Sequence, residues 1–371
     1  MWQNIFIMKY KNIYVAATSQ HVGKTTSTLG IVHKFKNMGV NVGYAKPVGQ
    51  QFLDLGNLRV DKDIILFSDL LGFEMVPEVH SPVILGKGAT ERFIDHPKNY
   101  DYPDRIKNAN KILNDTYDLT VYEGTGHPGV GTVTGVNNAK VAKMLDAGVI
   151  MVVEGGIGNT IDRFYMTTSL FREEGVPIIG VIINKVLRAK LDKVTHYVGR
   201  WLEMNNIPLI GVIPYDKTLA YPLMDIVTKK IKGEVLYNED KLDNRVANII
   251  SGSMIDYNNM KHPEDLLLLT DTKQIGKAID RIKMMEYMLK LDKSPLAGIV
   301  LTGEGECDID TIEYVEKNKI PVVHTPLDTY SSVIKISKIE VKINRHTPWK
   351  VQKAIELIGK NTDLDKALIE V

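Results

Sequence analysis

The sequence has a single cysteine and no recognisable export signal. Cys307 is the one cysteine among 371 residues. A lone thiol excludes an internal disulfide, a cysteine-based zinc cluster and a redox pair within one chain. The N-terminal segment is apolar only briefly before Lys9 and Lys11, so it lacks the core of a signal peptide. Both features favour a reducing, cytoplasmic location.

The sequence also lacks an excess of either charge and any long apolar run. Lys and Arg number 46 against 45 Asp and Glu, which gives a formal net charge of +1. A protein that neutralises many phosphates of a nucleic acid usually carries a basic excess, so we expect no nucleic-acid partner. The longest apolar runs, at 149–153 and 176–183, are far shorter than the roughly 20 residues of a membrane helix. We therefore expect no membrane association.

What the sequence does contain is an alternation of short apolar runs and helix-like stretches. Strands are expected at residues 13–17, 40–45, 120–122, 149–153, 178–183 and 208–213. Helices are expected between them, at 24–37, 62–71, 101–114, 137–145, 161–174 and 191–205. Most of the runs lack polar alternation, which is typical of strands buried on both faces of a parallel sheet. The pattern predicts an α/β fold with a doubly wound, mostly parallel sheet that binds ligands beyond its carboxyl edge.

A second, shorter α/β series follows a polar connection around 226–240. Its expected strands lie at 266–269, 296–301 and 322–324, and its expected helices at 274–291, 309–318 and 347–358. At about 150 residues per domain, the length of the chain suits two domains. We expect a nucleotide-binding domain at 1–230 and a smaller α/β domain at 231–371 that includes the C-terminal helix.

The strongest motif is a phosphate loop between the first strand and the first helix. Gly23-Lys24-Thr25 opens the helix, whose free N–H groups suit a di- or triphosphate. Lys24 would span the β- and γ-phosphates, and the Thr25 hydroxyl would bind Mg²⁺. Thr18 stands where the usual pattern has its first glycine. The predicted nucleotide-binding residues of the loop are His21, Val22, Gly23, Lys24, Thr25 and Thr26; for the His21 side chain, a solvated loop histidine is the alternative.

Two carboxylates could complete a magnesium site. Glu123 ends an apolar strand and precedes a glycine-rich loop at 124–131, which would bring it to the metal from across the phosphate loop. The alternative is a surface glutamate at a strand end. Asp63 opens the helix at 62–71, and its alternative role is a helix cap.

Two further polar residues follow predicted strands. Lys46 would lie beside the phosphate loop, where it could neutralise the γ-phosphate or an adjacent acyl-phosphate or carbamate; the alternative is a solvated lysine. Asn184-Lys185 begins like a guanine-binding Asn-Lys-x-Asp motif, but Leu187 occupies the acidic position. Guanine would therefore lose a partner for its donors, which favours adenine. Asn184 could contact the base or be an ordinary strand-end asparagine.

These segments, in this order, resemble dethiobiotin synthetase. The matching segments are 17–25, 43–48, 123–126 and 180–184, together with Asp63. The resemblance is closer to the synthetase-like N-terminal region of long phosphotransacetylases, through segments 127–131, 137–139, 155–163, 183–186 and 211–214. Ser253-Met254 before the strand and turn at 266–271, together with segments 298–303 and 321–330, resemble the DRTGG domain that follows there. The resemblance implies Mg²⁺ and ATP as cofactors, Lys24 and Lys46 as catalytic residues, and Thr25, Asp63 and Glu123 at the metal.

Two functions are compatible with this resemblance. One is an ATP-dependent ligase that activates a carboxylate or carbamate of a small-molecule substrate before an amine attacks it. The other is a nucleotide-dependent regulatory or adaptor protein with little turnover. No acyltransferase domain lies within residues 1–371, and Cys307 lacks the context of a glutaminase nucleophile, so we expect neither activity from these residues alone. A homodimer is an expectation from the resemblance.

Overall fold

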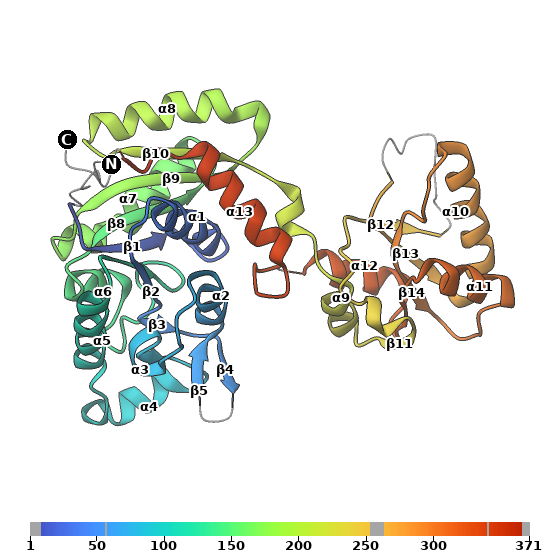
Figure 1. Cartoon of the computed structure of the whole chain (residues 1–371), viewed down its shortest axis with the longest axis horizontal. Helices are drawn as coiled ribbons and strands as arrows, with labels where there is room; N and C mark the ends of the chain where they lie inside the picture. Colours follow the sequence, from blue (N-terminus) through green and yellow to red (C-terminus); the bar gives the residue numbers. More distant parts are fainter. Residues whose placement is uncertain (1–8, 56–57, 253–262, 340, 366–371) are drawn as a thin grey trace. The chain divides into compact units, whose positions relative to one another are not determined.

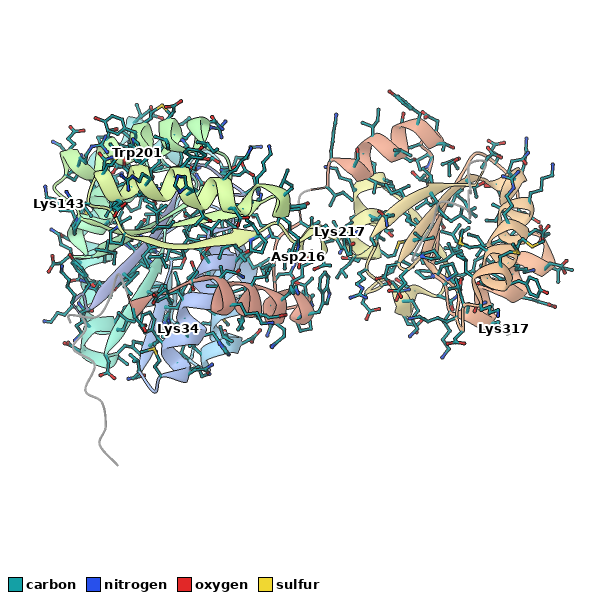
Figure 2. The ribbon with its side chains drawn as sticks, turned by 90° about the horizontal axis from the view of Figure 1, so that it is seen from above. Lys34, Lys143, Trp201, Asp216, Lys217 and Lys317 are labelled. Carbon is teal, nitrogen blue, oxygen red and sulfur yellow. The ribbon has the colours of Figure 1, made fainter. Side chains whose placement is uncertain are left out.

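The computed structural model describes residues 9–55, 58–252, 263–339 and 341–365 (Figure 1). The segment Ser253-Met254 lies outside these described residues. The chain forms two compact units. The first comprises the residues up to Asp216 and those from Ile343 onward, and the second comprises Lys217–Lys342. Asp216 and Lys217, where the chain first passes from one unit to the other, are labelled in Figure 2.

A six-stranded parallel sheet forms the centre of the first unit. Its strands lie in the order β10-β9-β8-β1-β7-β2. The chain winds outward from β1 in both directions, which confirms the predicted doubly wound fold. Two small two-stranded sheets, β3 with β6 and β4 with β5, accompany it. The strands are β1 Asn12–Ala17, β2 Val42–Ala45, β3 Val48–Gly49, β4 Phe52–Leu55, β5 Leu58–Asp61, β6 Val83–Ile84, β7 Leu119–Glu123, β8 Gly148–Glu154, β9 Ile178–Val186 and β10 Leu209–Pro214.

Helices surround this sheet, and its central strand is buried along its whole length. Apolar side chains on both faces of β1, such as Val15 on one face and Ala16 on the other, are buried, because neighbouring strands cover its edges and helices its faces. No helix in the described part of the chain is long and apolar enough to cross a membrane. The helices are α1 Lys24–Asn37, α2 Lys62–Leu71, α3 Pro77–His80, α4 Ala89–Asp95, α5 Tyr102–Thr116, α6 Asn138–Met144, α7 Gly158–Glu173, α8 Leu191–Met204 and α13 Pro348–Asn361, with short 3-10 turns η1 Pro97–Asn99 and η2 Arg188–Lys190.

The second unit contains a five-stranded sheet in the order β11-β15-β14-β13-β12, in which only β11 runs antiparallel to its neighbour. This is the predicted smaller α/β domain. Its strands are β11 Glu234–Tyr237, β12 Asn248–Ser251, β13 Leu266–Asp271, β14 Leu296–Thr302 and β15 Val322–His324. Its helices are α9 Met224–Ile231, α10 Ile275–Leu289, α11 Ile309–Asn318 and α12 Thr329–Ser337, with 3-10 turns η3 Lys217–Ala220, η4 Glu239–Lys241 and η5 Thr272–Gln274.

The polar connection expected around 226–240 is instead part of the second unit's fold. It contains most of α9 and all of β11. Met224, Val227 and Ile231 fall on one face of α9 and are fully buried, while Lys229 and Lys230 lie on the exposed face. Because of the exposed lysines, the sequence analysis took this segment for a polar connection. It is an amphipathic helix whose apolar face packs into the second unit.

The C-terminal helix belongs to the first unit, so the prediction that 231–371 forms one domain is wrong at its C-terminal end. Helix α13 packs beside α1 (Figure 1). Gly30 of α1 makes this approach possible, because a Cβ there would lie 2.2 Å from Ile358 Cβ. Beyond α13, the backbone N–H of Asp363 donates to the carbonyl of Ile210 in β10. The boundary near 230 also moves, to 216–217.

Candidate nucleotide site

The phosphate loop joins the end of β1 to the start of α1, as the motif predicts. Gly23, the residue before α1, has a left-handed φ of 105°. A Cβ at this position would lie 2.1 Å from Asn184 Nδ2, so both the backbone conformation and the space favour glycine. Gly23 has no side chain with which to cap the start of α1, and the first turn of the helix holds no acidic residue. The first N–H groups of the helix are thus available to an anion.

The motif residues Lys24 and Thr25 contact the carboxyl end of β7 and the segment that follows it. Lys24 Nζ donates to the carbonyl of Gly126 at 2.8 Å and lies 3.4 Å from that of Ser19. Thr25 Oγ1 donates to Glu123 Oε1 at 2.8 Å. The structure therefore brings together Thr25 and Glu123, which lie 98 residues apart in the sequence. Thr26 lies in the same first turn of α1.

Glu123 is a buried carboxylate at the carboxyl end of β7, which rules out a surface glutamate. It is only 2% exposed, and Tyr44 donates a second hydrogen bond to it at 3.4 Å. Burial, and next the negative charge of Asp63, raise the pKa of Glu123 to about 7, against the opposing effect of Lys46. A bound cation would favour the ionised carboxylate and bring this pKa down.

Lys46 is a buried lysine held by two carboxylates, which excludes the solvated alternative. Its Nζ lies 3.0 Å from Asp61 Oδ1 and also contacts Asp63 Oδ2. Burial would lower the pKa of Lys46, but the charges of Asp63, Asp61 and Glu123 outweigh it and raise that pKa above its ordinary value. Lys46 therefore remains an ammonium ion with its charge compensated in the buried cluster.

Asp61 takes the role of helix cap that the sequence suggested for Asp63. Asp61 Oδ1 accepts a hydrogen bond from the backbone N–H of Asp63 at the start of α2. Asp61 Oδ2 is buried and has no hydrogen-bond partner among the residues that the structure describes, and burial raises the pKa of this carboxyl. Sequence reasoning missed Asp61, although an aspartate directly before a helix is a recognisable cap signal. Asp63 contacts Lys46, and its role as a metal ligand stays a prediction.

Asn184 supports the phosphate loop from the carboxyl end of β9. Its Nδ2 donates to the carbonyl of Val22 at 2.8 Å, and its Oδ1 accepts from the backbone N–H of Lys185. The side chain is 6% exposed. Lys185, which the sequence analysis named only as part of the incomplete guanine-type motif and gave no role, donates from Nζ to the carbonyl of His21 at 2.5 Å. A contact between Asn184 and a base stays a prediction.

Asn138 organises the loop that follows Glu123, and sequence reasoning missed it as well. Its Oδ1 accepts hydrogen bonds from Tyr14 Oη and from the backbone N–H of Thr125. Its Nδ2 donates to the carbonyls of Thr125 and His127. One buried amide thus joins β1 to two points of the loop that also contacts Lys24.

The donors around Thr25 fit a magnesium ion that is bound together with phosphates. Within the described ranges, no three His, Cys, Asp or Glu side chains form a metal-binding group. Mg²⁺ in nucleotide sites commonly takes one or two carboxylates and completes its shell with water and phosphate oxygens. The adjacent Thr25 hydroxyl and Glu123 carboxylate provide two hard oxygen donors of this kind.

Comparisons with known proteins agree with this geometry. Residues 11–222 match the AAA domain family, and residues 226–339 match the DRTGG domain. The chain is 24% identical to a phosphate acetyltransferase of Nitratidesulfovibrio vulgaris over 361 residues, which cover 95% of this chain and 50% of that protein. It is 28% identical to a probable cobyric acid synthase of Methanocaldococcus jannaschii over 57% of this chain and 47% of that protein. An ATP-dependent dethiobiotin synthetase of Clostridium kluyveri is 29% identical over 47% of this chain and 74% of that protein.

The chain spans about half the length of the acetyltransferase and of the cobyric acid synthase. The predicted resemblance to dethiobiotin synthetase, and to phosphotransacetylases through a DRTGG domain, is confirmed. The AAA domain match covers more than half of the chain and includes the whole strand–loop–helix unit around Lys24. The chain therefore belongs to the AAA domain family as a P-loop NTPase-like protein, with a DRTGG domain as its second part.

Proposed function

We propose that the chain binds Mg-ATP at the phosphate loop and transfers the γ-phosphoryl group to a carboxylate or carbamate, which an amine then attacks. The observation that carries the proposal is the buried Lys46 cluster at the carboxyl edge of the sheet, next to Thr25 and Glu123. Burying a cation among three carboxylates is costly unless the site uses it. Such a cation suits an anionic acceptor beside the γ-phosphate.

Each residue of the site has a distinct role in this proposal. The N–H groups at the start of α1 and the Lys24 ammonium bind the β- and γ-phosphates. Thr25 and Glu123 hold Mg²⁺, whose charge stabilises the phosphate oxygens when it is bound. Lys46 orients the acceptor oxyanion, and Asp61 keeps Lys46 in place through the ion pair at 3.0 Å. Catalysis then consists of positioning and charge neutralisation.

ATP is proposed over GTP because Leu187 occupies the position where a guanine-binding motif has its acid. The acid and the amine are proposed to be small molecules. A homodimer stays a prediction from the family resemblance.

A nucleotide-dependent regulator is the second candidate function. The acetyltransferase match runs through both units of this chain, whereas the dethiobiotin synthetase match covers 47% of it. The similarity to half of a larger enzyme thus extends over both units of this chain. This extent favours an accessory region that senses nucleotide. Both candidates require Mg-ATP binding and differ in turnover.

Binding is tested first, by calorimetric titration of the full chain with Mg-ATP. We expect Lys24→Ala to lower the affinity by about a hundredfold, because a charge-assisted contact to the phosphates is lost. Lys111→Ala, which removes an exposed lysine from α5, should bind as the wild type does. Unchanged affinity in Lys24→Ala would refute the phosphate-loop assignment itself.

Turnover is then tested by measuring ADP and phosphate release with panels of acids and amines. We expect Lys46→Met to abolish acid-dependent release while it leaves Mg-ATP affinity within about threefold of wild type. Lys46→Arg, which keeps the positive charge, controls for the two carboxylates that Lys46→Met would leave buried without a cation. A wild type that binds Mg-ATP but releases no phosphate with any pair would favour the regulator.

A further inference from the structure

We propose that Lys185 is a positioning residue of the nucleotide site, which fixes the phosphate loop by holding the carbonyl of His21. This inference rests on the proposed nucleotide site and names a residue that fixes the conformation of its phosphate loop. Lys185 lies near the end of β9, on a strand separated from β1 only by β8. It acts together with Asn184, so two consecutive side chains hold two consecutive carbonyls of the loop.

The contacts are short and partly shielded from water. Lys185 Nζ lies 2.5 Å from the carbonyl oxygen of His21, and Asn184 Nδ2 lies 2.8 Å from that of Val22. The Lys185 side chain is 35% exposed. Its distance to Glu154 Oε1 is longer, 3.6 Å, and Glu154 is 50% exposed. The contact with the loop is therefore the principal one, and the ion pair with Glu154 is secondary.

Planar peptide groups convert these two contacts into an orientation of N–H groups. In a trans peptide the N–H points opposite to the C=O of the preceding residue. Holding the carbonyls of His21 and Val22 toward β9 therefore turns the N–H groups of Val22 and Gly23 away from β9. Successive N–H groups arranged around left-handed residues form a concave site for anions.

Backbone strain explains why the loop needs this support. His21 has a φ of 60°, a left-handed conformation that is uncommon for residues other than glycine, and Gly23 follows with 105°. Lys185 itself has a φ of 58°. Such residues persist only where their surroundings hold them, and they gather at functional sites. The contact between Lys185 and His21 joins two of them.

The test uses Lys185→Met in the full chain, with two measurements. Hydrogen exchange of the amides at 18–23, without nucleotide, should become about tenfold faster, because a charge-assisted hydrogen bond to the loop is lost. The Mg-ATP dissociation constant should rise about tenfold for the same reason. Lys185→Arg, which keeps a cationic donor, should restore both values to within about threefold of wild type.

Matched variants test whether the effects of Lys185→Met come from the lost contact with the loop, and not from the lost charge or from misfolding. Lys190→Met removes an exposed lysine close by and should change neither measurement. Glu154→Gln removes only the secondary ion pair and should likewise match the wild type. If Lys185→Met fails to fold, Lys185→Asn replaces it, because asparagine adopts the left-handed conformation readily but is too short to reach His21.

The outcomes distinguish this inference from the proposed function. If hydrogen exchange of the amides at 18–23 in Lys185→Met equals that of the wild type, the proposed role of Lys185 is refuted. Unchanged Mg-ATP affinity in this variant, with a wild type that binds, also overturns it. A wild type that binds no nucleotide refutes the proposed function. The hydrogen-exchange measurement alone then tests whether Lys185 holds the loop.

Discussion

Each unit contains its own mostly parallel sheet. The two units differ at the helix N-termini that lie beyond the carboxyl edges of these sheets. In the first unit, Gly23 precedes α1 without a side-chain cap, and the first turn carries no acid. In the second unit, Asp308 caps α11 and Asp328 caps α12, each by accepting a backbone N–H. A carboxylate at such a position satisfies the helix end and repels an incoming phosphate.

The polar groups along the two carboxyl edges differ in the same way. In the first unit, ionisable groups such as Lys46 and Glu123 are buried together. In the second unit, threonines pair with the chain itself: Thr272 donates to the carbonyl of Thr302, and the hydroxyls of Thr302 and Thr329 lie 2.9 Å apart. With a similar architecture, the first unit thus has buried ionisable groups at its carboxyl edge, whereas the second unit has threonines that bond within the chain.

The largest effect is expected from giving α1 the acidic cap found in the second unit. Gly23→Asp would place a carboxylate beside the phosphates, and two unit charges about 4 Å apart interact by about 4 kcal/mol near a protein surface. We expect Mg-ATP affinity to fall at least about a hundredfold below that of Gly23→Asn. Calorimetric titration measures the difference.

Gly23→Asn is the matched control for this experiment. The side chain of asparagine has the same shape as that of aspartate, and both residues adopt a left-handed backbone comparably. The added Cβ would lie equally close to Asn184 in both variants. Any cost of the added Cβ therefore cancels between the two variants. Equal affinities would show that charge at this helix end does not set the contrast between the units.

A smaller effect is expected from pH, through Glu123. Its pKa of about 7 means that magnesium must displace a proton below that pH. Mg-ATP affinity should therefore rise from pH 6 toward pH 8, by up to about tenfold per unit below pH 7. The phosphates of ATP titrate too, so the measured quantity is the slope of the wild type minus that of Glu123→Gln. Identical slopes would contradict the elevated pKa.

The same carboxyl predicts a change in stability without nucleotide. Its pKa lies above the ordinary value of 4.5, so the folded chain binds more protons than the unfolded chain between pH 4.5 and about 7. Stability from this group is full below pH 4.5 and is lost as the pH rises through 7. Urea titrations should show this loss in the wild type and not in Glu123→Gln.

The sequence was sufficient for features that depend on local pattern. Gly23-Lys24-Thr25 predicted the phosphate loop, and strand-end position predicted that Glu123 would face it. The strands β1, β8 and β9 lie where apolar runs placed them, within three residues at each end, and β7 contains the predicted segment 120–122. Buried parallel strands are recognisable from a single sequence because every side chain in the run is apolar.

The remaining features depend on which distant segments meet. Nothing local in Asn138 or Lys185 indicates that one ties β1 to the loop after β7 and that the other holds His21. Helix α13 was placed with its sequence neighbours, but the chain returns to the first unit, where Gly30 admits Ile358. A small residue on one helix and a branched one more than 300 positions later give no signal separately.

The smallest effect is expected from removing a cap in the second unit. Asp308→Ala deletes the acceptor for the backbone N–H of Thr311, which lies at 2.7 Å, and should lower the free energy of unfolding by about 1 kcal/mol. Asp308→Asn keeps the acceptor and should recover most of that loss. Mg-ATP affinity should stay within about twofold of wild type in both variants, because the phosphates are bound by α1. A second nucleotide bound per chain after the charge of Asp308 is removed would show that the capping carboxylate alone had excluded anions from this edge of the second sheet.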